Sequence, residues 1–316
     1  MAGDTRETGR LTRRQVLAGA GVAMAGAASV GAPVQAAGKP FSLCLNTGTM
    51  RGFQLPLTEV VDLAAKAGYD ALEPWVGDIE SHVKAGGTLK DLAARIKDRG
   101  LAVVSSIAFF EWVVEDEARR GRGLEEAKRL MDLVRQIGGT RIAAPPAGAT
   151  EVANLDLLKA AERYRALLEL GDQMGVTPQL EIWGFSKCLN RLGAGVFVAA
   201  ESGHPKACVL ADVCHLYRGG SPFSGLGLLS GRAMHVFHMN DVPAGVPPEQ
   251  MTDDRRLYPG DGVAPLKQVL LDLRAAGFTG ALSLELFNRD YWKQDPLLVA
   301  STGLRKMKEL ARGAGG

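Results

Sequence analysis

The sequence predicts an α/β fold, a (β/α)8 TIM barrel, and three observations predict it. Short apolar runs rich in β-branched residues alternate with helix-forming segments, as is typical of parallel strands joined by helical crossovers. Eight such strands can be placed after residue 40, and the roughly 280 residues available suit a barrel of this kind. No GxGxxG sequence follows the first strand, which disfavours the alternative of an open doubly wound sheet.

Each expected strand is a short run rich in apolar residues, and some of these runs end at a proline or a polar residue. Pro145 and Pro146, for example, directly follow the fourth run and end it. The expected strands cover residues 41–46, 69–75, 101–108, 140–144, 179–183, 207–213, 235–239 and 281–287.

Segments with helical periodicity separate most of these strands. Gly68, Gly100 and Gly175 each follow one of them, as expected of glycines that end helices. Residues 37–316 contain no internal repeat, low-complexity tract or linker, so we expect a single barrel domain there. The expected helices cover residues 57–67, 89–98, 115–137, 155–174, 265–276 and 296–311.

The composition is that of a globular chain that can bury a core without cross-links. It is 46% hydrophobic and 23% charged, which excludes collagen-like, coiled-coil and wholly disordered chains. The net charge of +2 comes from the first 36 residues, so the neutral remainder predicts no nucleic acid partner. The four cysteines match neither a CxxC zinc site nor a disulfide framework, and we interpret them as buried apolar residues.

The first 36 residues have the pattern of an export signal. A charged stretch ends in Arg13-Arg14, an uncharged Ala/Gly-rich run follows, and cleavage is expected near Ala36. The residues around Arg13-Arg14 resemble a twin-arginine signal, which implies the twin-arginine export machinery as a partner and a periplasmic protein. The alternative is a transmembrane helix, but Gly and Ala gain little by burial in lipid, so we expect no membrane anchor after cleavage.

Ionisable residues stand at the ends of five expected strands. They are Glu73, Glu181, Asp212, His238 and Glu285. In a (β/α)8 barrel the carboxyl ends of the strands surround the active site, so these groups are expected to converge. Buried carboxylates that converge would repel one another, and a divalent cation would relieve that repulsion. Three carboxylates and an imidazole suit Mn²⁺, Mg²⁺, Co²⁺ or Zn²⁺.

Several short motifs carry a resemblance to a known family. QLEIWGF, ADVCHLYRGG, HVFHMND, YPGDG and LSLELF, in this order, resemble the sugar phosphate isomerase/epimerase family with a xylose isomerase-like TIM barrel. GYDALEPW at the second strand also fits. The resemblance covers residues 39–311 and implies one divalent metal ion, held by Glu181, Asp212, His238 and Glu285.

The resemblance also implies a mechanism and a substrate class. Glu181 and Glu285 would act as base and acid on a ketose or keto-sugar, through an enediolate, to isomerise or epimerise it. His215 matches the substrate-contacting histidine of the family. Other expected substrate contacts are Glu73, Lys187, Trp75, Trp183, Arg256 and Phe287, although each of these could equally have a packing or surface role.

Two departures argue against a simple ketose 3-epimerase. Lys187 stands where those relatives have a second glutamate, and Ala244 stands where they have an arginine. Arg255 or Arg256 could replace that arginine, and Lys187 could bind an anionic substrate.

Three alternatives remain at this point. A dehydratase or lyase acting on a keto-sugar or keto-inositol would use the same proton abstraction. A non-catalytic sugar-binding barrel would have lost the reaction but kept the fold. An endonuclease for abasic DNA shares the fold, but Arg256 replaces one of its histidine ligands and the neutral body does not suit DNA. The sequence leaves the oligomeric state open.

Overall fold

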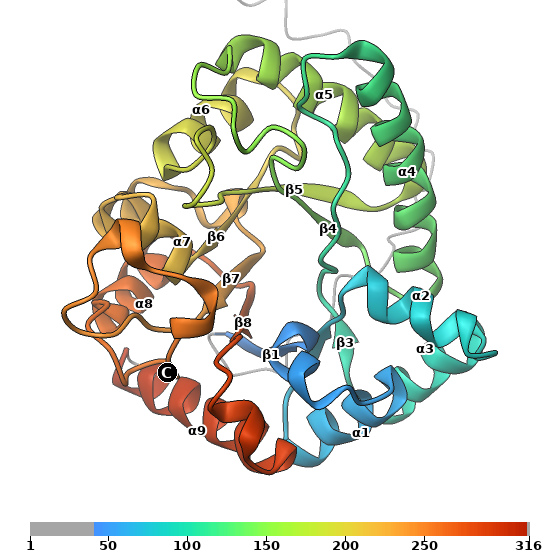
Figure 1. Ribbon diagram of the computed structural model, residues 1–316, viewed down its shortest axis with the longest axis vertical. Helices are drawn as coiled ribbons and strands as arrows, with labels where there is room; N and C mark the ends of the chain where they lie inside the picture. Colours follow the sequence, from blue (N-terminus) through green and yellow to red (C-terminus); the bar gives the residue numbers. More distant parts are fainter. Residues whose placement is uncertain (1–40, 315–316) are drawn as a thin grey trace, which may run out of the picture. The chain divides into compact units, whose positions relative to one another are not determined.

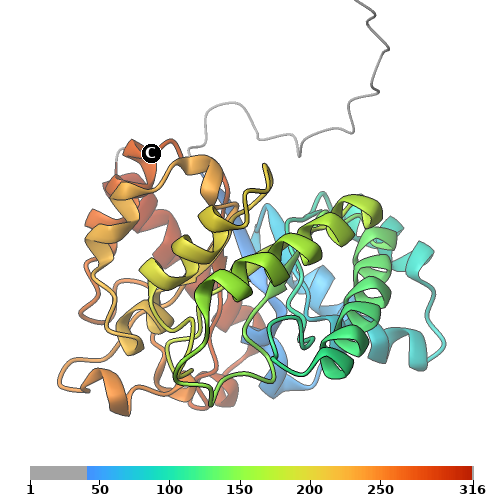
Figure 2. The same ribbon diagram turned by 90° about the horizontal axis from the view of Figure 1, so that it is seen from above.

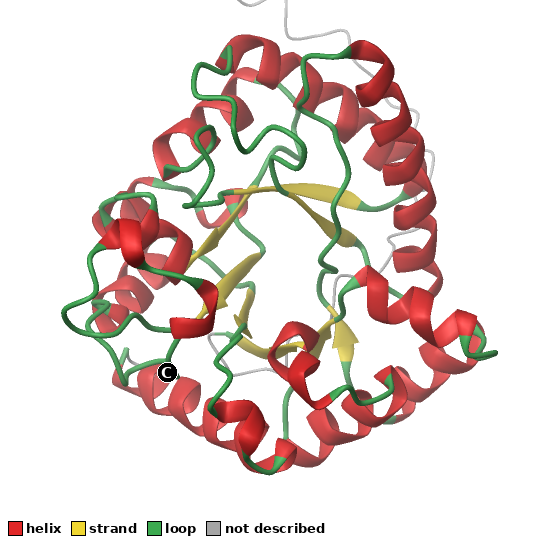
Figure 3. Ribbon diagram, viewed as in Figure 1, coloured by secondary structure: helices red, strands yellow, loops and turns green. Residues whose placement is uncertain are grey.

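The described residues form a closed ring of parallel strands inside a layer of helices. A computed structural model describes residues 41–314. Its eight strands lie in the order β3-β2-β1-β8-β7-β6-β5-β4, and Figure 3 shows them as an inner ring with helices outside. The predicted (β/α)8 barrel is therefore confirmed. The strands are β1 Ser42–Asn46, β2 Ala71–Glu73, β3 Ala102–Val103, β4 Arg141–Ala144, β5 Thr177–Glu181, β6 Val209–Asp212, β7 Val236–Met239 and β8 Ala281–Leu284.

The barrel closes between β3 and β4. The amide of Ser106 donates to the carbonyl of Arg141 at 3.2 Å, and the amide of Ala143 donates to the carbonyl of Ser106 at 2.8 Å. The third strand is shorter than the expected 101–108. Val104 donates to β2 while Ser106 donates to β4, so this segment pairs with both neighbours without a regular ladder.

The helices cover the outside of the ring (Figure 1), and α4 and α5 pack side by side along one flank (Figure 2). Their apolar faces and the outward-facing strand residues form the main core. All six expected helices are present. The helices are α1 Leu57–Ala67, α2 Val76–Lys84, α3 Leu89–Asp98, α4 Glu117–Gln136, α5 Leu157–Met174, α6 Leu192–Glu201, α7 Val213–Arg218, α8 Leu266–Ala275 and α9 Pro296–Gly313.

Three helices were not expected from the sequence: α2, α6 and α7. The segment of α6, LGAGVFVAAE, is apolar on every side and contains glycine, so it lacks the polar face that marks a surface helix. Helix α7 has only six residues and begins directly after β6. The side chain of Asp212 caps it by accepting a hydrogen bond from the amide of His215 at 2.8 Å.

The barrel interior is built in layers. An apolar layer of small and medium side chains forms a cluster separate from the main core; its strand residues are Cys44, Ala71, Ala143, Leu210, Val236 and Ala281. Side chains two positions apart on a strand point to the same side. The residues two positions further along most of these strands are polar and fully buried, namely Asn46, Glu73, Asp212, His238 and Ser283. This polar layer lies toward the carboxyl ends of the strands.

All four cysteines are free and buried, as predicted. Within residues 41–314, no helix is both long enough and apolar enough to span a bilayer. The expected export signal, with Arg13-Arg14 and the cleavage site near Ala36, lies outside the described residues.

Candidate active site

Three of the four expected metal ligands converge at the carboxyl end of the barrel. Asp212 ends β6, His238 lies in β7, and Glu285 directly follows β8. One ligand atom from each of these residues lies within 4.8 Å of the others, and all three side chains are buried. The strand register explains this, because Asp212 and His238 are paired across β6 and β7.

Glu181 ends β5, the next strand round from β6. It is 4% exposed, and its Oε2 is buried without a hydrogen-bond partner. Burial raises the pKa of Glu181 to about 8; the charges of Glu285 and Asp212 add to the rise, and that of His238 opposes it. An uncompensated carboxyl group beside two other carboxylates is the arrangement that a cation would stabilise.

His238 lies between two sets of carboxylates. Its Nε2 is 3.0 Å from Oε2 of Glu73, and its Nδ1 is 3.3 Å from Oε2 of Glu285 and 3.8 Å from Oδ2 of Asp212. Burial disfavours a charged imidazole here, but Glu73 and Glu285 outweigh it and hold the pKa of His238 well above its ordinary value. Nδ1 has no hydrogen-bond partner although it is buried.

Arg256 supplies a positive charge in the same cluster. It is 1% exposed, and its Nη1 donates to Oδ2 of Asp212 at 2.9 Å and to Oε2 of Glu285 at 2.8 Å. Its Nη2 donates to Asp253 at 2.7 Å. The predicted substrate contact thus lies against two predicted metal ligands.

The residues present fit a divalent cation. Glu181 Oε2 and His238 Nδ1 are buried without hydrogen-bond partners, and His238 Nδ1 faces the carboxylates of Asp212 and Glu285. Carboxylate oxygens carry two lone pairs each, so Asp212 and Glu285 can serve Arg256 and a metal ion together. The oxygen and imidazole donors suit a hard or borderline ion.

His215 lies beside this cluster in α7. It is 4% exposed, its Nε2 is 3.5 Å from Nη2 of Arg256, and its Nδ1 has no partner. Burial lowers its pKa, so the neutral imidazole is favoured. Its ring packs against Phe185 at 5.7 Å between centroids.

Aromatic rings from several loops form a connected row at the same end of the barrel. The ring centroid of Trp75 lies 5.9 Å from that of Phe287 and 5.3 Å from that of Phe109. The centroids of Phe109 and Trp183 are 5.6 Å apart. Trp183 continues the row to Phe185 at 5.0 Å. Phe109 and Phe185 are 45% and 39% exposed, so the row faces solvent in part.

Two other expected substrate contacts lie elsewhere. Glu73 is fully buried behind His238. Its Oε2 is hydrogen-bonded to Asn46, His238 and Ser283. Lys187 is 58% exposed and pairs with Glu151 at 2.9 Å, away from the buried cluster.

Four residues at the site are not predicted by the sequence, namely Asn240, Asn46, Phe109 and Phe185. Asn240 donates to Oδ2 of Asp212 at 2.8 Å and directly follows β7. Asn46 ends β1, so the rule that picked out ionisable strand ends would have found both if it had included amides. Phe185 lies within the QLEIWGF motif, and Phe109 directly follows the third expected strand.

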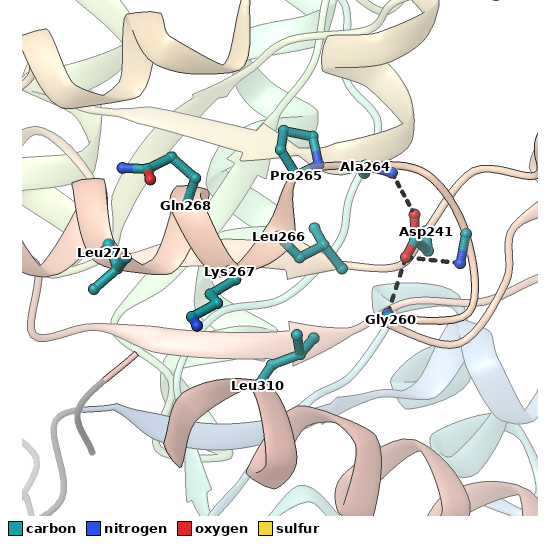
Figure 4. Close-up of a pocket in the computed structure, with 10 residues that line it drawn as sticks. Asp241, Gly260, Ala264, Pro265, Leu266, Lys267, Gln268, Leu271 and Leu310 are labelled. Atoms are coloured by element: carbon teal, nitrogen blue, oxygen red, sulfur yellow. Dashed lines mark hydrogen bonds between the residues drawn. The ribbon is translucent and has the colours of Figure 1, made fainter. Parts of the chain in front are cut away.

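Backbone hydrogen bonds between Asp241 and Leu257 close the base of the loop that carries Arg256. The backbones of Asp241 and Leu257 exchange two hydrogen bonds of 2.9 Å. The carboxylate of Asp241 also accepts from the amides of Gly260, Gly262 and Ala264 (Figure 4). A cavity of about 640 Å³ adjoins these contacts, and no predicted site residue lines it. Its walls are Asp241, Gly260, Gly262, Ala264, Pro265, Leu266, Lys267, Gln268, Leu271 and Leu310.

Known proteins similar to this chain include isomerases and a dehydratase. The family model described as xylose isomerase-like TIM barrel matches residues 61–310. An inosose isomerase of Bacillus velezensis is 25% identical over 84% of this chain and 94% of its own length. A 3-dehydroshikimate dehydratase of Pseudomonas aeruginosa is 25% identical over 79% of this chain, but only 39% of that longer protein is covered.

A solved structure of similar fold contains a metal. The crystal structure of the IOLI protein with a bound zinc atom superimposes with a TM-score of 0.78 over 86% of this chain and 98% of that one, at 22% identity.

Proposed function

Because the chain belongs to the xylose isomerase-like TIM barrel family, we propose that it is a divalent-metal-dependent isomerase or epimerase of a ketose or keto-sugar. One observation carries this proposal: Glu181, with a buried and unpartnered oxygen, lies beside the cluster of Asp212, His238 and Glu285. The relatives named inosose isomerase support the substrate class.

A divalent ion would be held by Glu181, Asp212, His238 and Glu285, and when bound it would supply positive charge that polarises a substrate carbonyl. The metal is Mn²⁺, Mg²⁺, Co²⁺ or Zn²⁺ in this proposal.

Glu181 and Glu285 are proposed to move the proton. They lie on β5 and just after β8, three strands apart in the barrel order, so they can reach a substrate from different sides. One carboxylate takes a proton from the carbon beside the carbonyl. The other returns a proton to the opposite face of that carbon, which epimerises it, or to the neighbouring carbon, which isomerises the substrate.

The neighbouring groups bind and orient the substrate in this proposal. His215 and Arg256 place hydrogen-bonding nitrogens beside the ligands, and Arg256 stabilises developing negative charge on oxygen. Trp75, Trp183 and Phe287 offer apolar walls for the C–H faces of a sugar. Lys187 is the exception, because its ion pair with Glu151 on the exposed rim gives it no contact with this cluster.

A dehydratase is the second candidate, and the 3-dehydroshikimate dehydratase relative favours it. The same base would remove the proton, and a hydroxyl group on the next carbon would accept a proton from the other glutamate and leave as water. No additional cofactor is required for this step.

The experiment that tests the proposal follows the products by proton NMR. Full-length protein loaded with Mg²⁺ or Zn²⁺ is incubated with a panel of ketoses, inososes and 3-dehydroshikimate. An isomeric product without loss of water supports the isomerase or epimerase, and new vinylic signals support the dehydratase. Tight metal binding with no reaction across the panel supports the non-catalytic sugar-binding barrel and contradicts the enzyme proposal.

We further propose that residues 1–36 direct export to the periplasm by the twin-arginine route. The support is the sequence pattern alone, an arginine pair followed by an uncharged run and a small-residue cleavage site near Ala36.

A further inference from the structure

We infer that Glu73 is a positioning residue that fixes which nitrogen of His238 faces the metal ligands, and that Asn46 links this contact to Trp75. The inference rests on the metal site of the proposed function. It assigns a role to Glu73 that differs from the substrate contact expected from the sequence.

The strand register brings the four polar groups concerned into one layer. Asn46 at the end of β1 is paired with Glu73 at the end of β2, and His238 in β7 is paired with Ser283 in β8. All four side chains are fully buried, so bulk water does not satisfy their hydrogen bonds. Their hydrogen bonds are therefore made with one another and with neighbouring protein groups.

Oxygen Oε2 of Glu73 accepts from three neighbours. The amide Nδ2 of Asn46 lies at 3.1 Å, the hydroxyl of Ser283 at 2.7 Å, and Nε2 of His238 at 3.0 Å. The orientation of the Asn46 amide is set independently, because its Oδ1 accepts from the amide of Gly48 and from Nε1 of Trp75, both at 2.8 Å. Asn46 therefore presents its NH₂ group to Glu73, and Oε2 of Glu73 acts as an acceptor.

This arrangement determines the tautomer of His238. An acceptor at 3.0 Å requires that Nε2 carry a hydrogen. In the neutral imidazole, the lone pair then lies on Nδ1, and Nδ1 is the nitrogen that faces Glu285 and Asp212. His238 would thus bind a metal ion through Nδ1, with Glu73 behind it as the orienting carboxylate.

The same contacts reach the aromatic row. Trp75 donates to Asn46, Asn46 donates to Glu73, and Glu73 accepts from His238. A ring that we propose as a substrate wall is therefore joined to a metal ligand through two buried side chains.

The test measures Zn²⁺ affinity of the full chain by competition with a chromophoric chelator. Glu73→Gln keeps the size of the side chain but removes the charge and one acceptor oxygen, and we expect it to weaken binding by about 10–100-fold. Ser283→Ala removes one of the three donors and should weaken binding by a smaller factor. Ser105→Ala is the matched control, because Ser105 is equally buried in the barrel but bonds Gln179 instead of the cluster.

A second readout reports the tautomer directly. In the Zn²⁺-loaded protein with ¹⁵N-labelled histidine, NMR should show His238 with metal on Nδ1 and hydrogen on Nε2. In Glu73→Gln a mixture of ring states is expected.

Equal Zn²⁺ affinity of the wild type, Glu73→Gln and Ser283→Ala, with metal on Nδ1 throughout, would overturn the inference and leave the metal site standing. Failure of the wild type to bind Zn²⁺ would instead contradict the proposed function. If Glu73→Gln does not fold, the comparison of Ser283→Ala with Ser105→Ala decides: weaker binding by Ser283→Ala alone supports the inference, and equal binding overturns it.

Discussion

The guanidinium of Arg256 lies 2.8 Å from the carboxylate of Glu285 at the carboxyl end of the barrel, and both side chains are buried. The same nitrogen donates to Asp212, so Arg256 neutralises two carboxylates that would otherwise repel each other. This contact makes the charge balance of the cluster dependent on a residue from the loop after β7.

Arg256→Met should destabilise the metal-free protein by about 3–5 kcal/mol, because it leaves buried carboxylates without their counter-charge. Saturating Zn²⁺ should restore part of the loss, since the ion supplies the missing charge. Urea unfolding with chelator and with Zn²⁺ measures both effects. Arg255→Met is the control: Arg255 is exposed, and it should change stability little. An unchanged unfolding free energy for Arg256→Met in chelator would contradict this view of the cluster.

Glu181 should make the stability of the metal-free protein depend on pH. Its folded pKa of about 8 lies above the ordinary value of 4.5, so the folded state binds the proton more tightly than the unfolded state. The contribution of protonated Glu181 to the free energy of unfolding is fully present below about pH 4.5 and is lost as pH rises toward 8. Unfolding free energies at several pH values in chelator should therefore fall less steeply for Glu181→Gln than for the wild type. Parallel profiles for the two proteins would show that Glu181 is not perturbed.

His235 should act in the opposite direction. Burial and the nearby charge of Arg141 lower its pKa from 6.5 to about 4, so the folded state resists protonation. The stability present above pH 6.5 is then lost as pH falls toward 4. His235→Gln should flatten that part of the profile. A His235→Gln profile that coincides with that of the wild type contradicts the assignment.

The cysteines should be unreactive in the folded protein. All four are buried, and burial raises the pKa of Cys208 and of Cys214 to about 12, so neither forms a thiolate at neutral pH. A thiol reagent should titrate none of them quickly in native protein and all four in denaturant. One fast-reacting thiol in the native protein would be the contrary result.

Export should depend on the arginine pair. Changing Arg13-Arg14 to Lys-Lys should leave the protein in the cytoplasm with its first 36 residues attached. Fractionation and mass measurement of the secreted form check this. Mature protein outside the cytoplasm in spite of the change would rule out the twin-arginine route.

Much of the fold could be predicted because barrel strands have strong local signals. Apolar runs such as the one that forms β6 end in a single ionisable residue. Because the carboxyl ends of parallel barrel strands lie on the same face of the barrel, Asp212, His238 and Glu285 come together there. Helix α6 could not be predicted, because an apolar segment with glycines shows no amphipathic period.

The parts of the site that sequence reasoning could not settle depend on contacts across the barrel. Glu73 ends a strand just as Asp212 does, and only the positions of Ser283 and Asn46 show that it orients His238. Lys187 lies in the expected loop, but its side chain turns outward to Glu151. The sequence predicts Arg256 as a substrate contact. In the fold it bonds Asp212 and Glu285, two of the expected metal ligands, and its loop is closed by the backbone hydrogen bonds between Asp241 and Leu257.

The central claim is that Glu181 and Glu285 move a proton beside a carbonyl in a metal-loaded site. Its most direct test is deuterium incorporation from D₂O into an inosose or ketose, followed by NMR for the Zn²⁺- or Mg²⁺-loaded wild type, Glu181→Gln and Glu285→Gln. Glu169→Gln, an exposed glutamate of α5 paired with Arg165, is the control. We predict incorporation next to the carbonyl by the wild type and by the control, and rates about 10²–10⁴-fold lower for the two site variants. Incorporation at the wild-type rate by either site variant, with metal bound, would contradict the account.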